Sequence, residues 1–247
     1  MKKLFTVLLL ALTMGVVLPQ QAFAQDSKKE KKEKKKSKPF VWEMPELTGN
    51  ETFDNYLKTC DTLYHRIRSY SDSIVFYKVK KGVVTDKKTG EQKEVMGVFD
   101  EEGNLRSSGK ALLQYAELTL QGTSLLGDLA VITTSTAAAS TALPSLGMKA
   151  LSYGKYVKAG PKIVQMGTDE VGEIVKMTRT QAKEIRALRK GYNEEGQLKD
   201  ASIDPSNIDG VDLTTVESVQ IEDYDKFCEQ QATVAKEDKA IGEVEEF

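Results

Sequence analysis

The sequence contains few of the side chains on which most enzyme sites depend. Its 247 residues include one histidine (His65), two cysteines (Cys60 and Cys228) and one tryptophan (Trp42). A single histidine cannot supply a two-histidine metal site, and the two cysteines lack metal-ligand spacing. On a helix, Cys60 and His65 would lie about 140° apart around the axis, which disfavours a catalytic pair. The sequence therefore predicts no catalytic residue, no cofactor and no metal site.

Loops that bind phosphate or calcium are also missing. No glycine-rich loop is followed by the Gly-Lys-Ser/Thr of a phosphate site. The segment around Gly210 resembles the centre of a calcium loop, but alignment on this glycine puts Pro205 at the first ligand position and Val216 at the last, where a carboxylate is required. An irregular, weak calcium site is the alternative, and it would use Asp204, Asp209 and Asp212.

The first 24 residues have the features of a secretory signal peptide. Two lysines precede the uncharged run Leu4–Leu18, Pro19 follows it, and Ala22–Ala24 gives the small-x-small pattern for cleavage before Gln25. As a helix the run spans ~22 Å against ~30 Å of hydrocarbon, so an uncleaved transmembrane helix is the weaker alternative. We therefore expect a periplasmic, extracellular or cell-envelope protein. The lysines after the run oppose this expectation, because positive charge there disfavours translocation.

Residues 25–46 form a basic arm followed by a proline-bracketed apolar segment. Eight lysines and three acidic residues lie between Gln25 and Lys38, without apolar side chains, which predicts a disordered spacer. The alternatives are an arm that folds onto the acidic end of the chain and a surface that binds anionic membrane, at ~1 kcal/mol per lysine. Nucleic acid is excluded as a partner of this lysine tract, because the tract contains no arginine and no interleaved aromatic residue. The residues of such an interaction surface would be Lys28, Lys29, Lys31, Lys32, Lys34, Lys35, Lys36 and Trp42.

Residues 47–192 predict a predominantly helical α+β domain. Thr48 and Glu51 read as a capping box before apolar residues spaced three and four apart from Phe53 to Ile67, which predicts an amphipathic helix. A small three-stranded antiparallel sheet packed by several helices is predicted next. Its strands are runs that are rich in β-branched and aromatic residues or bounded by turns, at 74–85, 93–99 and 104–107.

Three further helices are predicted after the strands. Ser107 or Ser108 can cap the first of them. Ser145–Ala159 predicts the second, with Leu151 among its inward residues and Gly160-Pro161 at its end. The third, 162–192, carries apolar and small residues in alternating steps of three and four, as in a coiled-coil seam. We expect this seam to pack inside the chain, and self-association through it is the alternative.

The stretch Leu129–Met148 contains no charged residue and consists largely of Ala, Ser, Thr and Gly. Small residues allow close helix packing, so a tightly packed buried helix is the favoured interpretation. Pro144 interrupts the stretch, and its serines and threonines disfavour a spanning helix. The alternative is a membrane-associated protein that inserts residues 122–148.

Residues 193–247 are strongly acidic, with 16 acidic residues and four lysines. They predict a polar tail with one short helix at 222–236 and disordered terminal residues. In an oxidising compartment, Cys60 and Cys228 could form a disulfide that closes a long loop, and two buried free thiols are the equal alternative.

These observations favour an exported, non-enzymatic interaction or structural protein. Its partner would be an unknown envelope protein or a second copy of the chain, with an anionic membrane surface as a further partner. The alternatives are the membrane-inserting protein described above and a hydrolase of unknown type.

Overall fold

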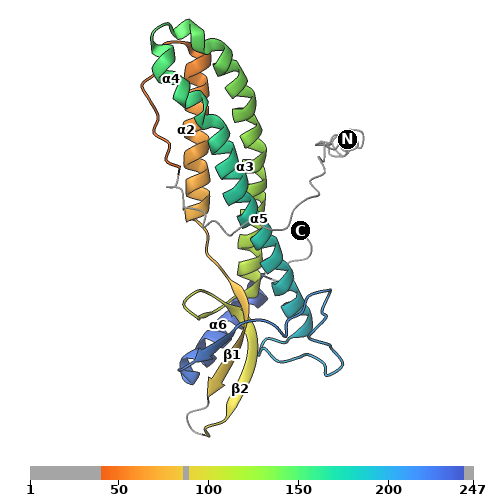
Figure 1. The fold of residues 1–247 in the computed structure, drawn as a ribbon. Helices are drawn as coiled ribbons and strands as arrows, with labels where there is room; N and C mark the ends of the chain where they lie inside the picture. Colours follow the sequence, from red (N-terminus) through yellow and green to blue (C-terminus); the bar gives the residue numbers. More distant parts are fainter. Residues whose placement is uncertain (1–39, 86–88, 242–247) are drawn as a thin grey trace, which may run out of the picture. The chain divides into compact units, whose positions relative to one another are not determined.

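Three long helices, α2 (Glu51–Asp72), α3 (Ser108–Ala142) and α5 (Ala159–Gly191), pack lengthwise as a bundle (Figure 1). The computed structural model describes residues 40–85 and 89–241, so the predicted signal peptide and lysine tract lie outside the described residues. Each helix buries an apolar stripe, and every member of the stripe predicted for α2 is buried. Burial of each large side chain is worth roughly 1.5–3 kcal/mol, so these stripes hold the bundle together. Its fully buried side chains include Phe53, Leu57, Ile67, Ile132, Ile163 and Ile185.

The start of α2 differs from the predicted capping box. Asn50 is the N-cap, and its side-chain oxygen accepts a hydrogen bond from the backbone N–H of Phe53 at 3.0 Å. Asp54, rather than Glu51, reaches back, and it accepts hydrogen bonds from the backbone N–H and the hydroxyl of Thr48, both at 2.7 Å. The helix therefore begins two residues later than a cap at Thr48 would place it.

The sequence prediction is confirmed at both ends of α3. Ser107 is its N-cap and accepts a hydrogen bond from the backbone N–H of Lys110 at 3.0 Å. Pro144 lies in the short 3₁₀ turn η1 (Leu143–Leu146) that follows the helix. Proline has no N–H to continue the α-helical hydrogen bonds, so α3 ends before it.

The short helix α4 (Lys149–Val157) leads from η1 into α5. Gly160 and Pro161 do not end the preceding helix as predicted; they lie in the first turn of α5, where proline needs no hydrogen-bond donor. Tyr56 of α2 holds this junction, since its hydroxyl donates to the carbonyl of Tyr156 at 2.8 Å and accepts from the N–H of Gly160 at 3.1 Å.

The sheet lies at the opposite end of the bundle from η1 and α4 (Figure 1) and contains four strands, with the order β3-β2-β1-β4. β1 (Lys78–Thr85), β2 (Gln92–Phe99) and β3 (Leu105–Arg106) form the predicted antiparallel part. The prediction of a purely antiparallel, three-stranded sheet is wrong, because β4 (Ser218–Ile221) adds to β1 in parallel. This strand comes from the acidic segment, where four residues are too few to show a periodic pattern.

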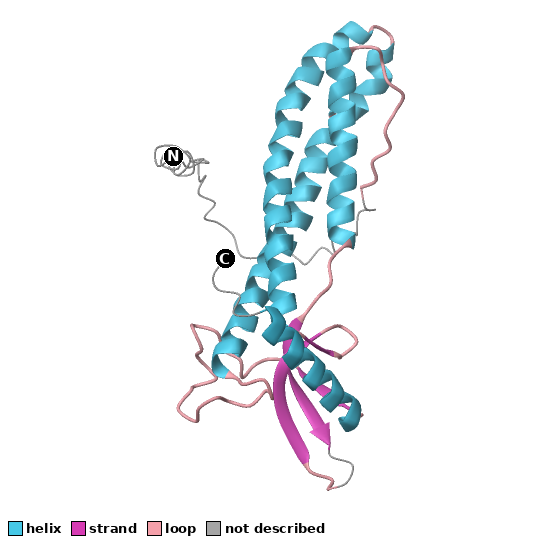
Figure 2. Cartoon of the chain, turned by 180° about the vertical axis from the view of Figure 1, so that it is seen from behind, coloured by secondary structure: helices cyan, strands magenta, loops and turns pink. Residues whose placement is uncertain are grey.

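The C-terminal segment is thus part of the folded unit rather than only a tail. Helix α6 (Tyr224–Ile241) packs near the sheet (Figure 2) and buries Phe227 against Val84 and Phe99. Near its end, Asp238 accepts hydrogen bonds from Ser107 and from the start of α3. Two residues of the connecting loop, Ile208 and Leu213, are buried in the main core.

Candidate functional site

The sequence-predicted candidates for chemistry lie apart from one another. Cys60 is fully buried in the bundle, whereas the side chain of His65 is 68% exposed and lies 3.6 Å from Asp61 on the same helix. The structure therefore puts Cys60 and His65 on different faces of α2. Burial raises the pKa of Cys60 to about 11, which keeps it as an unreactive thiol at neutral pH.

The two cysteines are free in the structure, and no bond joins them. Cys228 lies on α6 and is exposed, whereas Cys60 belongs to the core of the helical bundle. Of the two alternatives drawn from the sequence, the structure shows free thiols, one of them buried.

Each of the three carboxylates of the calcium-like segment has a hydrogen-bond or ion-pair partner in the chain. Asp204 and Asp212 accept hydrogen bonds from residues two positions later in the chain, and Asp209 pairs with Lys190. No group of three or more metal-ligating side chains is found in residues 40–85 and 89–241.

Trp42 does not belong to an exposed interaction surface. It is 5% exposed, and its indole N–H donates to Asp61 at 3.0 Å while its ring contacts Tyr156 edge-on. The apolar ring is removed from water when the proline-bracketed segment packs along the bundle, so Trp42 is a core residue.

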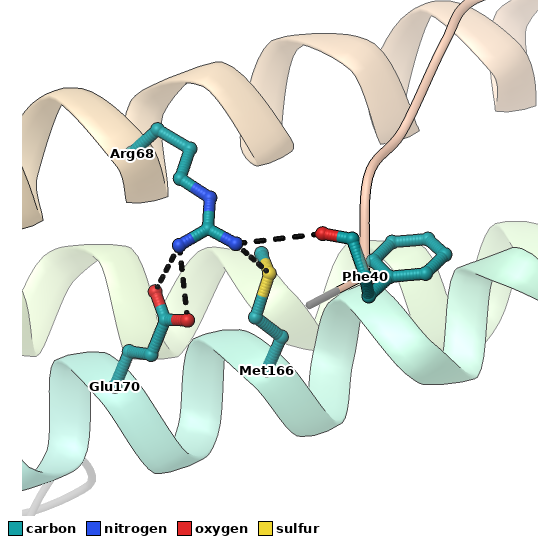
Figure 3. Close-up of polar contacts among 4 residues, drawn as sticks. All are labelled: Phe40, Arg68, Met166 and Glu170. Atoms are coloured by element: carbon teal, nitrogen blue, oxygen red, sulfur yellow. Dashed lines mark hydrogen bonds and ion pairs between the residues drawn. The ribbon is translucent and has the colours of Figure 1, made fainter. Parts of the chain in front are cut away.

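A second anchor of the same segment is the guanidinium of Arg68 (Figure 3). It donates two hydrogen bonds to Glu170, at 2.9 and 3.0 Å, and thereby joins α2 to α5. Its other terminal nitrogen lies 3.2 Å from the sulfur of Met166 and 3.5 Å from the carbonyl of Phe40. Three groups, two from α5 and one from the segment before α2, thus meet at this guanidinium, which has a structural role.

A groove of about 1470 Å³ lies between the sheet, the end of α5 and α6. Two ion pairs lie along it, Lys190 with Asp209 and Lys239 with Glu194. Neither His65 nor either cysteine lines it. Among its lining residues, the hydroxyl of Ser108 donates to the carboxylate of Asp238 at 2.9 Å, a contact that joins α3 to α6.

The uncharged stretch Leu129–Met148 is not a buried helix, contrary to the favoured prediction. Only Leu129, Ile132 and Ala139 of this stretch are buried, and the opposite face of α3 is exposed, including Val131 at 54%. A bundle of three helices buries one stripe of α3, and none of the described residues covers its other face. Hydroxyls on this part of α3 donate back to the helix's own carbonyls, as in the bonds Thr134 to Ala130, Thr136 to Ile132 and Ser140 to Thr136.

Two large apolar side chains are exposed at the start of α4, and Figure 1 shows that this part of the chain lies at the end of the bundle remote from the sheet. Met148 is 95% exposed and Leu151 is 94% exposed, the highest values among the described large apolar side chains. Of the inward residues predicted for this helix, Leu146, Tyr153 and Val157 pack against the core as expected, whereas the prediction for Leu151 is wrong. Fully exposed side chains of this size are unfavourable in water unless something else covers them.

Lysines are the only charged residues on this part of the chain. From Leu129 to Thr168 there are four lysines and no acidic residue. Lys149, Lys155 and Lys158 are exposed, and Met148, Leu151, Lys155 and Lys158 are three or four residues apart, so they share one face of α4. We call Met148, Lys149, Leu151, Lys155 and Lys158 the tip surface.

The seam predicted for residues 162–192 is already used inside the chain. Gly167, Val171, Thr178, Ile185 and Leu188 of this seam are all buried in α5, which packs against α2 and α3. Association with a second copy would therefore need a different surface.

The sequence contained one signal for the tip surface that the periodicity obscured. Gly147 has a positive φ of 60°, so it breaks the helix and leaves the next residues at a corner of the chain.

Comparison with known protein families, curated proteins and solved structures finds no match for this chain.

Proposed function

We propose that this chain is an exported, non-enzymatic protein of the bacterial cell envelope that attaches to an envelope surface through the tip surface. Export is supported by the signal-peptide pattern of residues 1–24. The observation that carries the attachment is the almost complete exposure of Met148 and Leu151. The described residues that were considered for catalysis or metal binding lie apart from one another or form local pairs. This arrangement supports a role in binding rather than catalysis.

The rest of the fold is suited to present the tip surface away from the sheet. The bundle is fixed along its length by the Arg68–Glu170 pair and by the buried stripes of α2, α3 and α5. The junction below the tip is held by Tyr56, whose hydroxyl bonds to both Tyr156 and Gly160. A rigid support of this kind keeps the exposed side chains in one arrangement and lowers the entropy lost on binding.

Cell fractionation tests the proposal in two steps. The N-terminus of the mature chain should map to Gln25, and the wild-type chain should remain with the envelope fraction. M148S/L151S should move to the soluble periplasmic or extracellular fraction, because serine removes the apolar area that holds the contact. An intact Met1, or equal retention of the variant and the wild type, would contradict the proposal.

A second candidate is a protein that inserts residues 122–148 into a membrane. By length and composition, the segment Ser108–Leu146 is the one helix of the described residues that could cross a membrane. Its exposed face is uncharged over Leu129–Met148, and several hydroxyls there are satisfied within the helix. Alkaline carbonate separates the two candidates, since it releases a surface-attached chain and leaves an inserted chain in the membrane pellet.

A further inference from the structure

We infer that the tip surface docks on a lipid bilayer that carries anionic headgroups, with Met148 and Leu151 entering the acyl boundary and the lysines of α4 contacting the headgroups. The inference rests on the proposed attachment through the tip surface and names the chemistry of what is attached.

The first argument is the order of side chains along α4. Met148 and Leu151 lie at the start of the exposed face, next to the turn that ends the bundle, and Lys155 and Lys158 follow on the same face. At 1.5 Å per residue, Lys158 lies ~15 Å along the helix from Met148. Apolar residues at the extreme end, with ammonium groups set back from them, match the depth profile of a bilayer interface.

The second argument is the size of the apolar part. A stable protein–protein interface buries ~800 Å² on each partner and uses about 20–30 residues a side. Two apolar side chains at a corner of the chain fall far short of that area. A bilayer needs no complementary shape, so two inserted side chains together with lysines are enough for reversible attachment.

The third argument is charge. The 40 residues from Leu129 to Thr168 carry four lysines and no acidic residue, although the whole chain has a formal net charge of −2. None of the described acidic side chains forms an ion pair with Lys149 or Lys158. Electrostatics therefore favours anionic lipid, while the apolar pair decides whether attachment occurs.

Vesicle sedimentation tests the inference with the mature chain from Gln25. The wild type should sediment with vesicles of phosphatidylglycerol mixed with phosphatidylcholine. M148S/L151S should lose about tenfold or more of this partitioning, since each side chain is a fully buried apolar group when docked. The triple variant K149Q/K155Q/K158Q should lose roughly fivefold per lysine on these vesicles and little on phosphatidylcholine alone.

Matched variants separate the tip surface from the N-terminal lysines. Leu120 of α3 is 70% exposed and lies outside the tip surface, so L120S should sediment like the wild type. All of these variants keep Lys28–Lys36, so binding by the basic arm alone would leave M148S/L151S equal to the wild type. That result would overturn the inference.

Fluorescence gives a readout that does not depend on affinity. The only native tryptophan, Trp42, is buried and supplies a constant background. With Leu151→Trp, the emission should shift to the blue when anionic vesicles are added, whereas Leu120→Trp should give no shift. An unchanged spectrum for Leu151→Trp at lipid concentrations that sediment the chain would overturn the inference.

Failure of the inference and failure of the proposed function give different results. If M148S/L151S leaves the cell envelope but the wild type binds no vesicles, the tip surface attaches to a protein and only the lipid assignment fails. If the wild type is a dimer without lipid and M148S/L151S is a monomer, the occupant is a second copy. If fractionation shows no dependence on Met148 and Leu151, the proposed function fails as well.

Discussion

The side chain of Asp238, near the end of α6, accepts a hydrogen bond from the hydroxyl of Ser107 at 2.6 Å, although the two residues are 131 positions apart in the sequence. The same carboxylate accepts from the hydroxyl of Ser108 at 2.9 Å and from the backbone N–H of Gly109 at 2.8 Å. A carboxylate here also faces the positive end of the α3 dipole. One side chain therefore ties the last described helix to the start of α3.

We predict that Asp238→Ala lowers the free energy of unfolding by about 1–3 kcal/mol, because three hydrogen bonds and a favourable helix-end charge are lost. Asp238→Asn keeps a side-chain acceptor and should cost less. Urea denaturation followed by far-UV circular dichroism measures both changes. Asp225, in the first turn of the same helix, provides the control, since Asp225→Ala removes an equal charge remote from Ser107. Equal losses in the alanine variants at 225 and 238 would contradict the assigned role.

Two glycines on α3 should respond in opposite directions to the same substitution. A Cβ on Gly122 would overlap the hydroxyl of Tyr70 and a methyl group of Val175, and the Tyr70 hydroxyl is held by the carbonyl of Leu118 at 2.8 Å. Gly127 is exposed and has no atom within 4 Å of the added Cβ. Gly122→Ala should therefore destabilise the chain by about 1–3 kcal/mol through overpacking.

Gly127→Ala should stabilise the chain by up to about 1 kcal/mol, since alanine favours the helix more than glycine does. Thermal unfolding of the two variants side by side measures the difference. If both substitutions stabilise the chain, α3 does not approach α2 and α5 as closely as the structure describes.

How far the sequence predicts this fold depends on the length and strength of each local signal. The stripe of α2 extends over 15 residues from Phe53 to Ile67, and it was predicted correctly. β4 has only four residues, and its pairing depends on the free edge of β1, which no local pattern reveals. The exposed face of α3 was missed because small, uncharged residues are common in cores, so their composition alone predicted burial.

The tip surface was missed for a related reason. Leu151 was expected to point inward together with Leu146, Tyr153 and Val157, and the structure bears out the other three but leaves Leu151 exposed. Asn50 was missed as the cap of α2 because Thr48 and Glu51 match a stronger sequence motif.

Stability should fall in acid partly because of Asp100. Burial alone would raise the pKa of this carboxyl, but hydrogen bonds from the backbone of Asn104 and from Arg106 outweigh burial and hold the pKa below its usual 3.8. The ionised form therefore stabilises the folded chain above the unfolded-state pKa. This contribution is lost as the pH falls through the lower folded-state value.

We predict that Asp100→Asn destabilises the chain by about 1–3 kcal/mol at neutral pH, and that its difference from the wild type shrinks below about pH 4. Urea denaturation over a range of pH values measures this difference. A difference that stays constant down to pH 2 would show that the charge of Asp100 contributes nothing to stability.

The two cysteines should differ sharply in reactivity. Cys228 is exposed on α6, whereas burial in the bundle raises the pKa of Cys60 to about 11. Because the thiolate is the reactive form, a maleimide reagent should modify Cys228 in the folded chain and Cys60 only after unfolding in urea. Mass spectrometry counts the added groups, and Cys228→Ser provides the control, with no modification expected until the chain unfolds. If the oxidised mature chain shows no free thiol even in urea, the two cysteines are joined, and the packing of α6 relative to α2 must differ from the one described.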